Sequence, residues 1–167
     1  GMSERAHARV VAMDLSAVRA APGVVGVYRA RDIPGENDVS PVIKDDPLFA
    51  AGVVEYVGQS MFAVAAETLE QARRAAKLAK VTYEDLPAAL TIADAKEASL
   101  EIEPPQTMAR GDVAAALATA PRRLKGKLAI GGQDHFYLEG QVALAIPGED
   151  GDMRVYSSTQ NPSEMQH

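Results

Sequence analysis

The last third of the chain opens with Gly131-Gly132-Gln133-Asp134-His135-Phe136-Tyr137-Leu138-Glu139-Gly140 and closes with Tyr156-Ser157-Ser158-Thr159-Gln160-Asn161-Pro162. Between these motifs lie two apolar segments, residues 141–146 and 153–156, separated by a connection rich in Pro, Gly and Asp. This pattern predicts a β-hairpin. Asn161 followed by Pro162 is then a helix-start signal. Ligands often bind where a strand ends and a helix begins, because the first N–H groups of the helix are unpaired.

The segment before this region has the composition of a linker. Residues 102–108 include Pro104 and Pro105, and such stretches often separate domains. We therefore expect two domains, residues 1–104 and residues 105–167. In the second domain, Asp112 is expected to cap a short helix over residues 113–118. Residues 123–130 alternate charged and apolar side chains, which predicts a further strand.

The first domain contains two strand–helix–strand segments. In the first segment, strands at residues 8–15 and 24–28 flank a short helix at 17–21, and Asp14 or Ser16 can supply its cap. In the second, strands at residues 61–65 and 81–84 flank a helix that begins at Thr68, with Gln71 in the capping-box position.

The remaining segments of the first domain complete an α+β pattern. Residues 31–47 are expected to form a loop with at most one short strand, at residues 39–43. A strand at residues 53–57 is expected to join the following strand tightly at Gly58. Residues 92–99 indicate a weak helix.

Composition excludes several classes of function. The chain has 17 basic and 23 acidic residues, a net charge of −6, which disfavours binding to nucleic acid or to an anionic membrane surface. It has no cysteine, so it holds no disulfide, iron–sulfur cluster or thiolate nucleophile. Without an apolar run of about 18 residues or a signal peptide, a cytoplasmic location is expected. Gly1, ahead of Met2, is interpreted as a tag remnant without a part in the fold.

The two quoted motifs resemble the molybdopterin-binding region of the xanthine dehydrogenase/aldehyde oxidase family, and especially the molybdenum subunit of bacterial xanthine dehydrogenases. The resemblance implies an α/β-hammerhead domain, with its first strand missing, followed by the first hairpins of a molybdopterin-binding domain. Family chains are far longer than 167 residues. We therefore expect this chain to be truncated at both ends.

The resemblance also implies site residues. Gln160 is expected to approach the molybdenum centre and to hydrogen-bond its oxo ligand, because an amide can donate without adding charge. Gln133 is expected to lie near the cofactor. For Asp134, His135 and Glu139 we favour a buried polar network over acid–base catalysis. His7, His135 and His167 do not match a common zinc-site spacing.

The implied activity belongs to a larger enzyme. We expect a molybdenum–molybdopterin oxidoreductase that hydroxylates hypoxanthine and xanthine to urate, with 2Fe-2S clusters and FAD on other subunits. No catalytic residue of the family matches a position in this chain, so the chain alone is expected to be inactive. Two alternatives stay open. One is another molybdenum hydroxylase, acting on aldehydes, carbon monoxide or nicotinate. The other is a non-catalytic module that docks flavin and iron–sulfur subunits.

Overall fold

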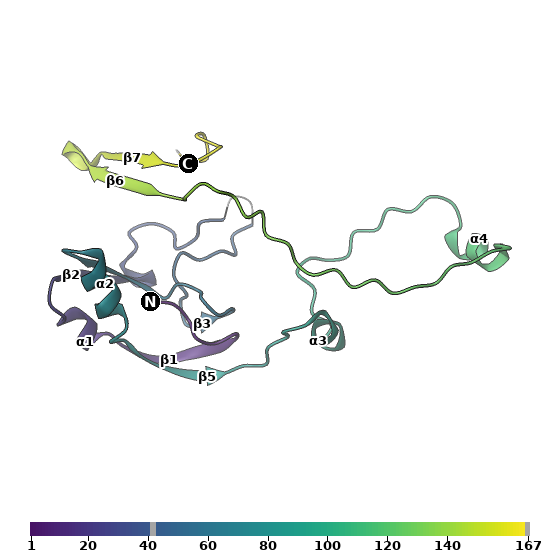
Figure 1. The fold of residues 1–167 in the computed structure, drawn as a ribbon, viewed down its shortest axis with the longest axis horizontal. Helices are drawn as coiled ribbons and strands as arrows, with labels where there is room; N and C mark the ends of the chain where they lie inside the picture. The colour runs from purple at the N-terminus through teal and green to yellow at the C-terminus, as the bar shows by residue number, and fades with distance from the viewer. Residues whose placement is uncertain (41–42, 166–167) are drawn as a thin grey trace. The chain divides into compact units, whose positions relative to one another are not determined.

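The structure is a computed structural model that describes residues 1–40 and 43–165 (Figure 1). The chain divides into an N-terminal unit, Gly1–Glu103, and a C-terminal unit, Pro104–His167. The elements of the N-terminal unit are β1 (Ala8–Asp14), α1 (Ser16–Arg19), β2 (Val24–Arg29), the 3-10 turn η1 (Ala30–Asp32), β3 (Val53–Val54), β4 (Phe62–Ala66), α2 (Leu69–Ala76), β5 (Lys80–Asp85) and α3 (Ile92–Glu97).

The two predicted strand–helix–strand segments are confirmed, and their strands pair with each other. β1 pairs antiparallel with β5, and β2 pairs antiparallel with β4. The short β3 pairs with the other edge of β1, which gives the sheet order β3-β1-β5 beside the separate pair β2-β4. The strand at residues 53–57 is shorter than predicted. It also forms no hairpin with β4, because β3 pairs with Ala8 and Arg9 while β4 pairs with β2.

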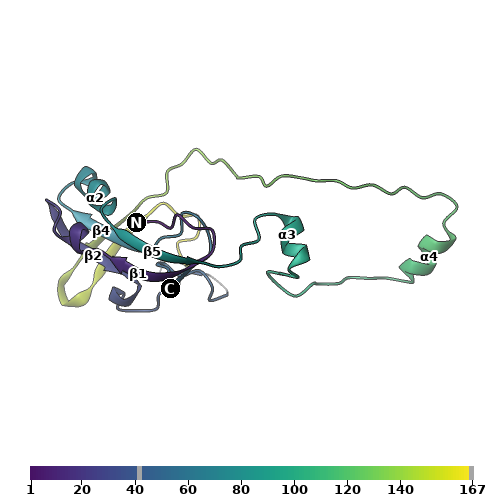
Figure 2. The ribbon, with the colours of Figure 1, turned by 90° about the horizontal axis from the view of Figure 1, so that it is seen from below.

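The hydrophobic core lies where the helices meet the strands. α1 and α2 contact each other, and both contact the β2-β4 pair; Figure 2 shows α2 next to β4. The buried apolar residues are Ala8, Leu15, Val18, Val27, Ala50, Val54, Met61, Phe62 and Ala75. Every strand and helix between β1 and α2 contributes to this cluster, which joins the two strand–helix–strand segments.

The helix caps follow the sequence closely. The Thr68 hydroxyl accepts the N–H of Gln71 at 3.2 Å and so caps α2 as predicted. The Gln71 side chain accepts from that same hydroxyl instead of from the Thr68 backbone, so only half of the capping box forms. A complete capping box, which sequence analysis missed, joins Thr91 and Asp94 at the start of α3. Asp14 accepts the N–H of Ser16 at 2.9 Å before α1.

The first three residues are part of the fold. The amino group of Gly1 donates to the Phe62 carbonyl at 2.8 Å, and the N–H of Met61 donates to the Gly1 carbonyl at 2.9 Å. Ser3 continues this pairing, since its N–H donates to the Gln59 carbonyl at 2.8 Å. The interpretation of Gly1 as a residue outside the fold is therefore wrong, because its backbone groups find partners beside β4.

The Asn37 amide makes two of the hydrogen bonds in the long connection between η1 and β3. The Asn37 side chain donates to the Phe49 carbonyl at 2.7 Å and accepts the Phe49 N–H at 3.0 Å. The short strand predicted at residues 39–43 includes positions 41–42, which lie outside the described residues; Val39, Ser40 and Ile43 are not in a strand.

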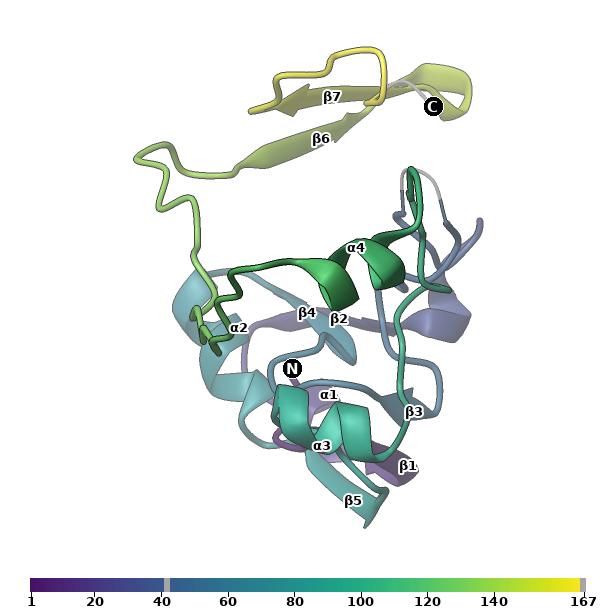
Figure 3. The same ribbon diagram turned by 90° about the vertical axis from the view of Figure 1, so that its right-hand side faces the viewer.

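The described residues of the C-terminal unit, 104–165, contain one helix and one hairpin. Its elements are α4 (Val113–Thr119), β6 (Ala143–Pro147), the 3-10 turn η2 (Glu149–Gly151) and β7 (Met153–Ser157). Asp112 caps α4 as predicted, accepting the N–H of Ala115 at 2.8 Å. The predicted hairpin is also confirmed, and Figure 3 shows β6 and β7 side by side.

The strand predicted at residues 123–130 is wrong. This segment, like the whole stretch from residue 120 to residue 142, holds no helix or strand. The alternation of charged and apolar side chains is present, but a strand also needs a neighbour for its N–H and C=O groups. Within the described part of the chain, no strand pairs with these residues.

Candidate cofactor-binding site

The open end of the β6-β7 hairpin carries the residues that sequence analysis singled out. The last residue pair of the ladder is Ala143 with Ser157. Beyond it, the two strands stay hydrogen-bonded for one more residue. The N–H of Ser158 donates to the Val142 carbonyl at 3.0 Å, and the N–H of Val142 donates to the Ser158 hydroxyl at 2.9 Å. Hydrogen bonds therefore fix the chain as it leaves β7.

A turn then places Gln160. The hydroxyl of Thr159 accepts the N–H of Asn161 at 3.0 Å. This bond spans two residues, as in the turns that Ser and Thr side chains commonly make with their own backbone. Gln160 lies at the apex, and its side chain is exposed. Residues 162–165 form a turn, so the helix start predicted at Asn161 and Pro162 is not found among the described residues.

One hollow of about 810 Å³ is lined by residues of both quoted motifs, and we call it the Gln160 hollow. Its lining residues are His135, Tyr137, Glu139, Gly140, Gln141, Ser158, Thr159, Gln160 and Asn161. The structure thus brings Gln160 together with His135 and Glu139. Gln133 is not among the lining residues, and it is exposed.

The predicted buried network of Asp134, His135 and Glu139 is wrong. All three residues are exposed. The segment that carries them belongs to the irregular stretch before β6, so no strand or helix of its own holds it against a core. Phe136 is 93% exposed and has a positive φ of 51°, an uncommon conformation for a residue with a bulky side chain.

The chemistry of the Gln160 hollow suits an oxygen-rich ligand. Gln141, Gln160 and Asn161 carry amides that can donate, and Ser158 and Thr159 add hydroxyls. These neutral donors fit contacts to the oxygens of an anionic cofactor. No group of three His, Cys, Asp or Glu side chains in the described residues could hold a metal ion directly. The hollow therefore fits a cofactor contacted through hydrogen bonds.

Sequence analysis missed Gln141 and Asn161 as lining residues. The hairpin register contained the signal for Gln141. Extending the pairing of Ala143 with Ser157 by two residues places Gln141 opposite Thr159, one position from Gln160. A register counted outward from the turn would have found it.

Family models match both parts of the chain. Residues 1–87 match the model described as "Aldehyde oxidase and xanthine dehydrogenase, a/b hammerhead domain". The chain belongs to the xanthine dehydrogenase/aldehyde oxidase family. Residues 95–167 match the model of the molybdopterin cofactor-binding domain. The family resemblance, the α+β fold and the class of cofactor expected from the sequence are thereby confirmed.

Individual members of this family are similar over nearly the whole chain. Xanthine dehydrogenase/oxidase from Gallus gallus is 42% identical over 95% of the chain, and aldehyde oxidase 2 from Rattus norvegicus is 44% identical over 98%. The solved structure of an aldehyde oxidoreductase from Desulfovibrio gigas is 28% identical over 93% of the chain, with a TM-score of 0.79. The chain spans 12% of the length of the two curated relatives and 19% of the solved chain.

No helix among the described residues is both long enough and apolar enough to cross a bilayer.

Proposed function

We propose that residues 105–167 supply one wall of a molybdenum–molybdopterin site and that residues 1–104 form the α/β-hammerhead domain beside it in sequence. The observation that carries this proposal is the turn at Gln160. Hydrogen bonds accepted by the hydroxyls of Ser158 and Thr159 hold the turn. The turn exposes the Gln160 amide at the rim of a hollow that is also lined by the amides of Gln141 and Asn161 and by Glu139. The match of residues 95–167 to the molybdopterin cofactor-binding domain supports the identity of the ligand.

Within that site, Gln160 is proposed to donate its amide N–H to an oxygen on the cofactor. Gln133 is proposed as a second contact, which requires the irregular segment before β6 to move toward the cofactor. When bound, the molybdenum centre supplies the hydroxylation chemistry. An amide at Gln160 suits this role because it donates a hydrogen bond and has no charge to compete with substrate. The turn fixes the position of the donor before the cofactor arrives, which reduces the cost of ordering it.

We propose that the whole enzyme is a xanthine dehydrogenase that converts hypoxanthine and xanthine to urate in purine breakdown in the cytoplasm. The 42% identity to the Gallus gallus xanthine dehydrogenase/oxidase supports this assignment. The 44% identity to the Rattus norvegicus aldehyde oxidase 2 supports an aldehyde substrate as a second candidate. Comparing turnover of xanthine and of an aromatic aldehyde by the whole enzyme separates the two.

The proposed partner is another subunit that holds 2Fe-2S clusters and FAD, through which electrons are proposed to leave. The 167 residues have no cysteine to ligate such a cluster. The rest of the molybdenum subunit is proposed to contribute the remaining walls of the site and the catalytic residues. The 167-residue chain alone is then inactive.

The decisive experiment replaces Gln160 by alanine in the whole enzyme. Loss of one hydrogen-bonding partner of a metal centre typically reduces activity or metal affinity about 10- to 100-fold, and we expect kcat/KM to fall by that amount. Gln106→Ala is the matched control, because Gln106 is an exposed amide of the same kind in the predicted linker. Full activity with full molybdenum content in the Gln160→Ala enzyme would refute the proposed contact.

A second measurement tests the isolated chain. Molybdenum and pterin analysis of the 167-residue protein expressed alone should show less than stoichiometric cofactor, because one wall cannot enclose the ligand. Stoichiometric molybdenum, or turnover of xanthine, would show that the chain is a complete site.

A further inference from the structure

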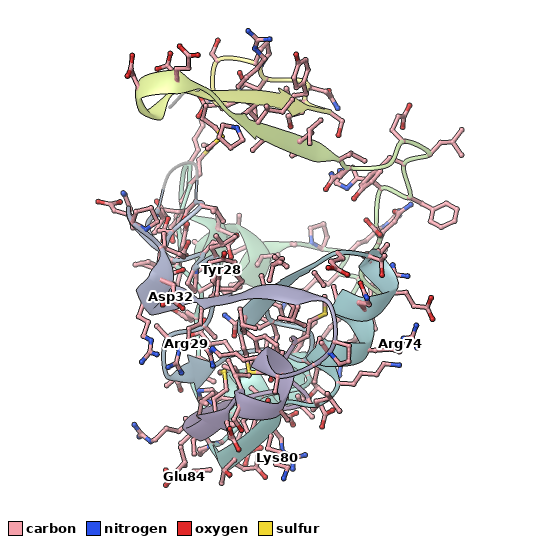
Figure 4. The ribbon with its side chains drawn as sticks, turned by 90° about the vertical axis from the view of Figure 1, so that its left-hand side faces the viewer. Tyr28, Arg29, Asp32, Arg74, Lys80 and Glu84 are labelled. Atoms are coloured by element: carbon pink, nitrogen blue, oxygen red, sulfur yellow. The ribbon has the colours of Figure 1, made fainter. Side chains whose placement is uncertain are left out.

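The ladder of the β6-β7 hairpin gives way to the turn at Gln160 at one residue, Ser158. Side chains project from the hairpin ribbon along its length (Figure 4), and in an antiparallel ladder every second residue pair is hydrogen-bonded. Gly148 and Asp152 form such a pair, because the N–H of Gly148 donates to the Asp152 carbonyl at 2.7 Å. Counting outward from this pair in steps of two reaches Val142 and Ser158, directly beyond the last residues of the two strands.

The pair of Val142 and Ser158 forms only half of the regular hydrogen bonding. In a regular pair of this kind, each residue donates its N–H to the carbonyl of the other. The N–H of Ser158 does so and reaches the Val142 carbonyl at 3.0 Å. The N–H of Val142 donates instead to the Ser158 hydroxyl at 2.9 Å. The side-chain oxygen of Ser158 therefore takes the place of its own carbonyl as the acceptor.

This exchange of acceptors allows the chain to leave the ladder at Ser158. A carbonyl bonded to Val142 would keep residue 158 in extended strand geometry, and the residues after it would continue in the strand direction. With the carbonyl released from that bond, the chain turns at once, and the Thr159 hydroxyl accepts the N–H of Asn161 at 3.0 Å. β7 accordingly ends at Ser157, and Gln160 lies in the turn.

Both functions of the Ser158 hydroxyl are directed at Val142. The oxygen accepts the Val142 N–H, and it lies 3.3 Å from the Val142 carbonyl, to which its proton can be donated. A serine hydroxyl has a single proton to donate. Ser158 also lines the Gln160 hollow, but this bonding suits its side chain to holding the backbone more than to contacting a ligand.

We propose that Ser158 is the positioning residue for Gln160. Its hydroxyl ends the ladder where the chain must turn, and the turn then presents the Gln160 amide at the rim of the Gln160 hollow. Without the hydroxyl, the Val142 N–H pairs with the carbonyl of residue 158, which lengthens the hairpin by one rung and moves Gln160 out of the turn. The expected effect on activity rests on the proposed contact between Gln160 and the cofactor, whereas the expected change in geometry does not.

The kinetic test uses variants of the whole enzyme. Ser158→Ala should lower kcat/KM about tenfold at full molybdenum content, as is typical when a group that orients a contact at a metal centre is removed. Ser158→Thr keeps the hydroxyl and should keep the activity, whereas Ser158→Val has nearly the same shape and should lose as much as Ser158→Ala. Ser157→Ala is the matched control, because the Ser157 hydroxyl makes neither bond to Val142.

A double substitution tests whether Ser158 acts through Gln160. If it does, the enzyme with both Ser158→Ala and Gln160→Ala is as active as the Gln160→Ala enzyme, because the group that Ser158 positions is already absent. Losses that multiply would overturn the proposal. Full kcat/KM in the Ser158→Ala and Ser158→Val enzymes, beside an impaired Gln160→Ala enzyme, would overturn it as well.

Crystal structures of the whole Ser158→Ala and Ser158→Val enzymes separate this proposal from the proposed function. The expected structures have the Val142 N–H on the carbonyl of residue 158 and the Gln160 amide displaced. A Gln160 side chain that has not moved overturns the positioning role, whatever the kinetics. A displaced Gln160 supports that role even if the Gln160→Ala enzyme is fully active, a result that refutes the cofactor contact alone.

Discussion

The two units of this chain differ in what their apolar residues touch. In the N-terminal unit, apolar side chains from β1 to α2 form one core, with Val18 and Val54 fully buried. In the C-terminal unit, all described residues are at least partly exposed, and Leu144, Val155 and Tyr156 of the hairpin remain 55%, 49% and 53% exposed. Both units are rich in apolar residues, so hydrophobic composition alone does not create a core.

The two units differ in burial because their strands pair over different distances in sequence. β1 pairs with β5, which joins residues as distant as Ala8 and Asp85. The hairpin joins only neighbours in sequence, and a two-stranded hairpin is at best marginally stable in water. Both faces of the hairpin carry an apolar pair, with Ala145 opposite Val155 on one and Leu144 opposite Tyr156 on the other. Strands with two apolar faces are typical of sheets covered on both sides.

The largest expected difference in stability is between replacing a buried methionine of the N-terminal unit and replacing an exposed methionine of the C-terminal unit. Met61→Ala should destabilise the protein by about 2–5 kcal/mol, because Met61 is 2% exposed and its removal leaves a cavity. Met153→Ala should change stability by less than about 0.5 kcal/mol, because Met153 is 58% exposed in the hairpin. Urea unfolding followed by circular dichroism measures both. Equal losses of stability would show that the hairpin belongs to the same cooperative core.

A smaller effect is expected from the helix caps. Thr68→Ala removes the acceptor for the Gln71 N–H and should cost about 1 kcal/mol in the main unfolding transition, since α2 packs on the core. Asp112→Ala removes the corresponding cap of α4, which has no buried residue. It should reduce helix content without moving the transition. A shift of the urea midpoint in Asp112→Ala would contradict independent behaviour of the two units.

The smallest effect concerns the pH dependence of the N-terminal unit. Hydrogen bonds from Ser16, and the nearby Lys80 to a lesser degree, lower the pKa of Asp14 from its ordinary value of 3.8. A carboxyl with a lowered pKa stabilises the fold above its ordinary pKa, and this contribution is lost as pH falls through the folded-state pKa. Urea midpoints of Asp14→Asn should therefore lie below those of the unmodified protein at neutral pH and converge with them in acid. Parallel curves at all pH values would contradict this account.

Local signals in the sequence predicted local structure. Thr68 and Asp112 marked helix starts correctly, because a cap depends only on residues within one turn. The Thr91 and Asp94 capping box was equally local and could have been read. The residues around 147–152 predicted the hairpin for the same reason, since turn chemistry is local.

Predictions that depended on distant partners were less successful. The strand expected at residues 123–130 has the right alternation but no neighbour in the described chain. The burial of His135 and Glu139 required other segments to cover them, and their own sequence cannot supply that cover. At the candidate site, the motif led to Gln160, while the turn made by Thr159 became visible only in the structure. The contacts proposed for Gln160 and Gln133 stay predictions.

The pairing of β1 with β5 also sets the order of events during synthesis. Ala8 meets its partner Asp85 only after the ribosome has added the intervening residues, which takes roughly 4–15 s at typical elongation rates. Until then, the edge of nascent β1 that pairs with β5 stays open. Chaperones that bind emerging apolar segments should therefore associate with this chain before Asp85 leaves the exit tunnel and should release it soon afterwards.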